Sequence, residues 1–152
     1  MPTLTRLAAL VLFAVMAFYL ASKYQSLNED IPEAQSINIF FAVVAAAVGW
    51  VFVGQRINRN VLQAFSVVIQ GYIATFLLAL GLSALYGIFT KGYQMRYKTF
   101  GDALEGSVDD AWAILQQIST ADFATVGLGG AAAITLFLVV IYRIAEAKRV
   151  AR

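Results

Sequence analysis

The chain contains no cysteine and no histidine. Without cysteine it can form neither a disulfide bond nor a thiolate ligand. Without histidine it lacks the usual protein ligand of haem and of most zinc sites, and an imidazole for acid–base catalysis. These absences exclude most metal centres and much enzymatic chemistry, although a metal site built from carboxylates alone stays open.

Charged residues and prolines are also scarce. Only 13% of the residues are charged and 61% are hydrophobic, whereas soluble domains have about 25% charged and about 45–50% apolar residues. A soluble fold of 152 residues with this composition would have too little polar surface. The net charge of +2 is too small to argue for a nucleic-acid partner. The composition therefore predicts an integral membrane protein.

Four apolar segments are long enough to cross a bilayer, because about 20 helical residues span the hydrocarbon layer. We expect spans over residues 4–21, 37–54, 61–89 and 121–142. The first could be a cleaved signal peptide, but its apolar run is long for one, and we interpret it as a membrane anchor. The third holds 29 uncharged residues. That length predicts either a tilted helix or one that continues past the bilayer through Lys91 and Arg96.

Residues 100–118, between the third and fourth spans, show a different pattern. Acidic residues alternate with apolar residues that recur at helical spacing, namely Phe100, Leu104, Val108, Ala111, Leu115 and Ile118. This pattern predicts an amphipathic helix in the membrane interface or against the bundle. The predicted fold is therefore all-α. It is a single-domain integral membrane four-helix bundle with one additional amphipathic interfacial helix.

Small residues spaced four apart run along the predicted spans. The third span has the longest such ridge, made of Gly71, Thr75, Ala79, Ser83 and Gly87. Gly127 and Ala131 have the same spacing in the fourth span, and Ala45 and Gly49 in the second. Small faces let membrane helices approach closely. We predict that these residues form packing faces, either within the bundle or against a helix of a partner protein.

Aromatic and basic residues gather near the predicted span ends. Indole and phenol rings favour the headgroup level of a bilayer, and long basic side chains extend to it. We interpret these residues as an interfacial anchor, or as a docking site for lipid or a partner. They are Trp50, Tyr93, Arg96, Tyr97, Lys98 and Trp112.

The charges differ between the two predicted sides of the membrane. With four spans, both termini share one side, which would carry seven basic residues and a single acid, Glu146. The opposite side would carry four basic residues. The positive-inside rule then places both termini in the cytoplasm. The seven are Arg6, Arg56, Arg59, Arg143, Lys148, Arg149 and Arg152, and the four are Lys23, Lys91, Arg96 and Lys98.

The interiors of the predicted spans contain almost no ionisable chemistry. Gln70 places one carboxamide inside the third span, and we expect it to bond Thr135 or a backbone carbonyl. No Asp, Glu, Lys or Arg lies deep in any span, and neither Pro2 nor Pro32 interrupts one. Ion-coupled transporters usually need an intramembrane charge or a broken helix. A small transporter is therefore the least favoured of the possible functions.

Several short motifs occur in a recognisable order. They are Met1-Pro2-Thr3 with Arg6, Val48-Gly49-Trp50 with Gly54, Arg96-Tyr97 followed by Gly101-Asp102-Ala103-Leu104, and a basic C-terminal end. Most of the chain resembles the TrgA family of alphaproteobacterial membrane proteins, a family named for tellurium resistance. The resemblance covers these motifs, the length of the chain and the order of its spans. The resemblance implies a non-enzymatic bacterial inner-membrane protein associated with tellurite resistance, and it brings no catalytic residue or cofactor.

A second interpretation rests on the residues alone. An accessory subunit of a larger respiratory or photosynthetic membrane complex would also be apolar, poor in chemistry and rich in small-residue faces. Membrane lipid is a partner in either case, and other membrane-protein subunits are partners in the second.

Overall fold

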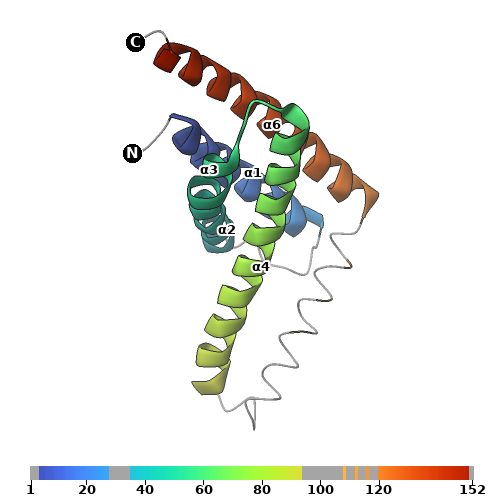
Figure 1. The fold of residues 1–152 in the computed structure, drawn as a ribbon. Helices are drawn as coiled ribbons and strands as arrows, with labels where there is room; N and C mark the ends of the chain where they lie inside the picture. The colour runs from blue at the N-terminus through green and yellow to red at the C-terminus, as the bar shows by residue number, and fades with distance from the viewer. Residues whose placement is uncertain are drawn as a thin grey trace.

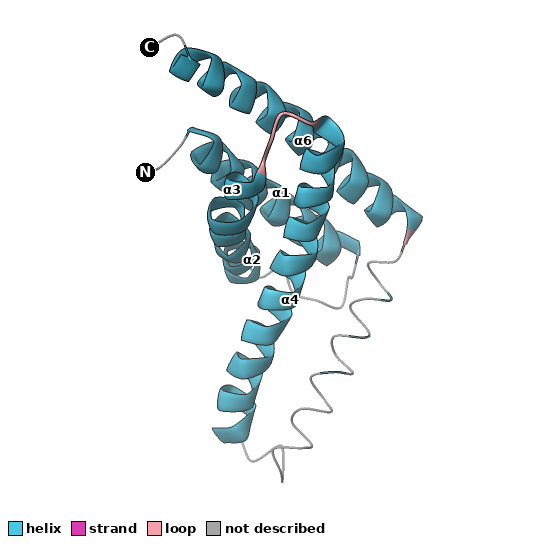
Figure 2. Cartoon of the chain, in the orientation of Figure 1, coloured by secondary structure: helices cyan, strands magenta, loops and turns pink. Residues whose placement is uncertain are grey.

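The computed structural model of the chain describes residues 4–27, 35–93 and 120–150, together with Val108, Trp112 and Gln116. The part of the chain described in this way contains helices and short connections, and no strand (Figure 2). Four helical segments are long and apolar enough to cross a membrane, namely Leu4–Ser26, Gln35–Arg56, Val61–Ser83 and Asp122–Ala145. The prediction of an all-α membrane helical bundle is confirmed, and the chain is a polytopic membrane protein.

The described residues form six helical elements. They are α1 (Leu4–Leu27), α2 (Gln35–Val48), the π-helical turn η1 (Gly49–Val53), α3 (Gly54–Arg56), α4 (Val61–Tyr93) and α6 (Ala121–Val150). The elements α2, η1 and α3 run on without interruption and together form the second span. In the π turn, the N–H of Gly54 donates to the carbonyl oxygen of Gly49, five residues earlier.

The four spans pack as a bundle around a shared apolar core. The first span, α1, packs against α2 and α6, and α4 packs against the same two helices (Figure 1). The fully buried side chains at the centre include Phe13, Val53, Val68 and Leu138. The spans are apolar around their whole circumference, because one side of each faces this core and the other faces lipid.

Several helix ends differ from the boundaries expected from hydropathy, and α6 continues to Val150 instead of ending at 142. The expected spans leave the polar segment 22–36 as a connection, but α1 continues to Leu27 and α2 begins at Gln35. The expectation is therefore wrong for residues 22–27 and for 35 and 36. The helix continues because Ser22 and Gln25 accept hydrogen bonds from Asn38 on α2, which gives these polar residues partners inside the helical bundle.

The α4 helix is longer than a bilayer is thick. Its 33 residues extend over about 50 Å, compared with about 30 Å of hydrocarbon. The helix passes through Lys91 and ends at Tyr93, so the expected continuation occurs that far, and Arg96 lies outside the described residues. Its C-terminal half lies away from the other described helices (Figure 1), and Leu82, Leu85 and Tyr86 are exposed.

The expected amphipathic helix over residues 100–118 lies outside the described part of the chain except at three positions. Val108, Trp112 and Gln116 are helical and exposed. The α6 helix begins at Ala121, where the N–H of Ala124 donates to the carbonyl oxygen of Thr120, and Asp122 lies in its first turn.

Candidate functional site

Two glycines of the second span lie against the backbone of α1. A Cβ atom added at Gly49 would lie 2.6 Å from the carbonyl oxygen of Ala9, and one added at Gly54 would lie 2.7 Å from the Cα of Arg6. Both distances are shorter than real Cβ contacts. Only glycine therefore fits at these two positions unless the helices move apart.

The π turn explains how these two glycines come to face the same helix. In a regular α-helix, residues five apart point about 140° away from each other around the axis. A π turn takes up one more residue, so that Gly49 and Gly54 stack on one side of the span. The π turn therefore places both Gly49 and Gly54 against α1.

The small-residue ridge of α4 is divided between the interior and the exterior of the bundle. Gly71, Thr75 and Ala79 are buried, and Ser83 is exposed. A Cβ added at Gly71 would meet Val53 Cγ2 at 2.5 Å and the ring of Phe13 at 2.9 Å. The Thr75 hydroxyl donates to the carbonyl oxygen of Gly71 at 2.9 Å. Gly87 lies in the helix, and its surroundings fall outside the described residues.

In the fourth span, some of the small residues face the bundle and others do not. Ala131 and Thr135 are buried, and the Thr135 hydroxyl donates to the carbonyl oxygen of Ala131 at 2.7 Å. An added Cβ at Gly127 would have no neighbour within 4 Å. Gly130 is crowded instead, because a Cβ there would overlap the thioether end of Met16.

A second crowded point lies where α1, α4 and α6 meet. The ring of Tyr72 packs edge-on against Phe13, with 5.5 Å between the ring centroids. Its hydroxyl oxygen would lie 3.4 Å from a Cβ at Gly130. This hydroxyl is buried and has no hydrogen-bond partner among the described residues.

A buried polar cluster joins α1 to α2. The side-chain nitrogen of Asn38 donates to Ser22 Oγ at 3.1 Å and to Gln25 Oε1 at 3.3 Å. Asn38 and Gln25 are each 6% exposed. The Asn38 oxygen, Oδ1, has no hydrogen-bond partner in the described part of the chain. Hydrogen bonds of this kind hold membrane helices together and fix their relative position.

Gln70 does not find the partner that the sequence suggested. Its side-chain nitrogen donates to Ser66 Oγ on the same helix at 3.4 Å. Thr135 bonds within its own helix, so the expected contact between Gln70 and Thr135 is absent. The reason is direction, because Gln70 points out of the bundle and is exposed.

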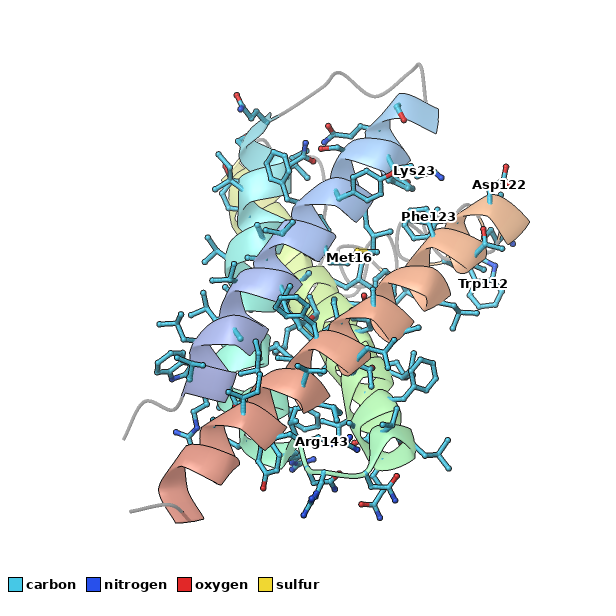
Figure 3. All side chains as sticks on the ribbon, turned by 90° about the horizontal axis from the view of Figure 1, so that it is seen from above. Met16, Lys23, Trp112, Asp122, Phe123 and Arg143 are labelled. Atoms are coloured by element: carbon cyan, nitrogen blue, oxygen red, sulfur yellow. The ribbon has the colours of Figure 1, made fainter. Side chains whose placement is uncertain are left out.

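Arginines mark one end of every span. Arg6, Arg56 and Arg143 lie within two residues of their span ends, and Arg59 lies two residues before α4. The guanidinium of Arg143 donates to the carbonyl oxygen of Arg59 at 3.2 Å, and that of Arg56 lies 4.0 Å from the centroid of the Phe52 ring. Lys23 and Asp122 lie at the opposite end of the bundle (Figure 3).

The predicted anchor residues are not gathered in one place. Trp50 is half-buried in η1, near the arginine end, whereas Trp112 is exposed and appears on the side of Asp122, away from Arg143 (Figure 3). Tyr93 is the last residue of α4, and nothing is described of its side chain. Arg96, Tyr97 and Lys98 lie outside the described residues, so a cluster of these four is not placed.

Three features of the site were missed in the sequence. Gly54 was noted only as a motif residue, because its five-residue distance from Gly49 does not match α-helical spacing. A four-residue spacing pairs Gly127 with Ala131 but gives no small partner to Gly130, whose neighbours at that spacing are Val126 and Ile134. Asn38 carried a usable signal, since an amide in an apolar segment usually finds a polar partner.

The described residues contain no group of three or more carboxylates that could hold a metal ion. Comparison with protein-family models, with curated proteins and with solved structures gives no match for this chain.

Proposed function

We propose that the chain is a non-enzymatic inner-membrane protein of the TrgA type that contributes to tellurite resistance. One observation carries this proposal. Arg6, Gly49 and Gly54 all belong to the motifs on which the resemblance rests, and they meet at the backbone contact between α1 and the second span. A role in holding the bundle together would explain why these residues are part of the motifs.

The proposed role in tellurite resistance is indirect, in the sense that the chain does not itself reduce tellurite. A protein that reduced tellurite itself would need a redox centre, and there is no cysteine or histidine with which to bind one. The polytopic fold agrees better with an effect on tellurite uptake or on the composition of the membrane.

Tellurite sensitivity of a gene-deletion strain tests the proposal. We expect the deletion to lower the tellurite concentration that stops growth, and the wild-type gene to restore it. Gly49→Leu should fail to restore it, because its side chain cannot fit against Ala9. Gly129→Leu is the matched control, since an added Cβ there has no neighbour within 4 Å. Unchanged sensitivity in the deletion strain would reject the proposed function.

We also propose that the arginine end of the bundle faces the cytoplasm, with both termini on that side. The support is the charge pattern, since each of the four spans has an arginine at this end. The chain has no native cysteine, so single introduced cysteines can be labelled cleanly. We expect Ser26→Cys to react with an impermeant thiol reagent added outside, and Asn58→Cys and Val150→Cys to be protected. External labelling at residue 58 or 150 would overturn the orientation.

An accessory subunit of a larger membrane complex is the second candidate, and the separated half of α4 favours it. Leu85 is 53% exposed. It lies on α4 beyond Ser83, where the membrane span ends, and a protein would cover it there better than water. Purification of a tagged chain in mild detergent should then recover other subunits. Recovery of this chain alone, as monomer or homodimer, would contradict the second candidate.

A further inference from the structure

Gln70 exposes a carboxamide close to the middle of the membrane. The third span runs from Val61 to Ser83, and Gln70 lies nine residues after its start, two residues before the midpoint. At 1.5 Å per residue, the side chain originates about 13 Å inside the hydrocarbon layer. The residue is exposed, so it faces away from the bundle and towards the lipid.

The hydrogen bonds that Gln70 makes within the chain leave most of its capacity unused. A carboxamide offers two N–H donors and an oxygen with two acceptor positions. The hydrogen bond to Ser66 Oγ uses one donor, and at 3.4 Å it is long. Lipid acyl chains contain no group that could satisfy the remainder, and unpaired polar groups are costly in hydrocarbon.

The residues around Gln70 form a continuous outward stripe on α4. Ser66, Gln70, Ile73 and Leu77 are all exposed, and they follow one another at intervals of four, three and four residues. This alternation is the spacing of a helix that packs along a second, nearly parallel or antiparallel helix. The opposite face of α4, which contains Gly71, Thr75 and Ala79, is already buried inside the bundle.

We propose that a second copy of this chain packs against this stripe, with the two Gln70 carboxamides hydrogen-bonded to each other across a two-fold axis. Two copies with the same orientation in the membrane present this group at the same depth. A carboxamide is also self-complementary, because the N–H of one can donate to the oxygen of the other and the reverse. The pairing uses the exposed side of α4, so each four-helix bundle stays intact.

Disulfide cross-linking in membranes tests the position of the interface. The chain has no cysteine of its own, so Ser66→Cys and Ile73→Cys each introduce a single thiol on either side of Gln70 along the stripe. We expect both to form dimers under mild oxidation, in native membranes and in phosphatidylcholine vesicles containing only the purified protein. Leu128→Cys is the control, because Leu128 is 55% exposed on a different helix and should stay monomeric.

Three cross-linking results would overturn the proposal. The first is the absence of dimers at both stripe positions, and the second is equal cross-linking at residue 128. The third is a cross-link that forms only in native membranes and joins the chain to another protein, which would make the stripe a docking site for a different partner.

The contribution of the carboxamide is measured separately, as the dissociation constant of the dimer in vesicles. Energy transfer between labelled copies at varied protein-to-lipid ratio gives this constant. We expect Gln70→Leu to weaken dimerisation about 3- to 10-fold, as for hydrogen bonds between membrane helices. Because Gln70 is exposed and its hydrogen bond to Ser66 lies within α4, thermal unfolding of the monomer should be unchanged.

Gln63→Leu is the matched control for that measurement. Gln63 is an exposed amide of the same helix, but it lies at the membrane boundary, and its oxygen accepts a hydrogen bond from Asn58 at 2.7 Å. The dissociation constant of this variant should equal that of the wild type. Equal constants for wild type and Gln70→Leu, or equal weakening by both substitutions, would contradict the proposed role of Gln70. The tellurite phenotype plays no part in either measurement.

Discussion

The glycines of the spans fall into two groups with opposite surroundings. Gly49, Gly54, Gly71 and Gly130 are crowded, because an added Cβ at each would come within 3 Å of a neighbouring span. Gly81, Gly127 and Gly129 are open, because no atom lies within 4 Å of an added Cβ. Both groups occur in apolar helices and look alike in the sequence. A small residue in a span lies at a helix contact only if it faces a neighbouring helix, and its position in the sequence does not show which way it faces.

The largest expected difference between the two groups is at Gly49. Gly49→Ala forces the new methyl group against the carbonyl oxygen of Ala9, and backbone cannot give way as a side chain can. We expect a loss of about 3 kcal/mol in the free energy of unfolding, measured by SDS titration in mixed micelles. Gly129→Ala should change this free energy by less than about 1 kcal/mol. Equal losses of unfolding free energy for Gly49→Ala and Gly129→Ala would contradict the distinction between crowded and open glycines.

The two ends of the α4 ridge should also differ. Ala79→Leu adds three carbon atoms at a position that is fully buried, and we expect it to cost about 2 kcal/mol through overpacking. Ser83→Leu places the same side chain at an exposed position one turn later and should leave the unfolding midpoint unchanged. If both variants were as stable as the wild type, the ridge would have no packing role.

A smaller cost is expected at Gly71, where the obstructing atoms belong to side chains. A methyl group there would lie 2.5 Å from Val53 Cγ2 and 2.9 Å from the ring of Phe13, so these side chains, and not the backbone, would have to shift. Gly71→Ala should therefore lower the free energy of unfolding by about 1 kcal/mol. Gly81→Ala, on the same helix, serves as its open counterpart and should not destabilise. A cost at Gly81 as large as at Gly71 would show that the separated half of α4 is covered.

The smallest effect concerns hydrogen bonding rather than space. Asn38→Ala removes the donor that joins Ser22 and Gln25 to α2. Such bonds between membrane helices contribute about 0.6 kcal/mol on average, and we expect a loss near that value in the same SDS titration. Asn58→Ala is a suitable control, because its amide bonds Gln63 in an exposed connection. A loss above about 3 kcal/mol at Asn38 would indicate that the cluster does more than align two helices.

Much of the fold could be predicted from hydropathy, because four apolar runs of sufficient length leave few alternatives. The helix ends could not. Ser22 and Gln25 look like loop residues in isolation, and their helical state depends on Asn38, which is 13 residues beyond Gln25 in the chain. Hydropathy records the polarity of a residue and not whether a partner satisfies it.

The candidate site was only partly predictable, for a similar reason. A four-residue spacing groups Gly71, Thr75 and Ala79, and all three are buried. It could not show that the ridge leaves the bundle before Ser83, because the end of a contact depends on where the neighbouring helices end. Gln70 was recognised as unusual, but the sequence does not state whether a side chain points inward or outward.

The π turn has a consequence for how this chain tolerates changes in length. Because it takes up one extra residue, everything before Gly49 is rotated by about 100° relative to a regular helix continued from Gly54. Deleting one of residues 50–53 would convert the turn into α-helix. The shortened span would still cross the membrane, and Gly49 and Gly54, then four residues apart, would still share a face towards α1. At this point the span tolerates the loss of one residue, whereas one inserted residue would turn the preceding helix by about 100° and separate the two glycines.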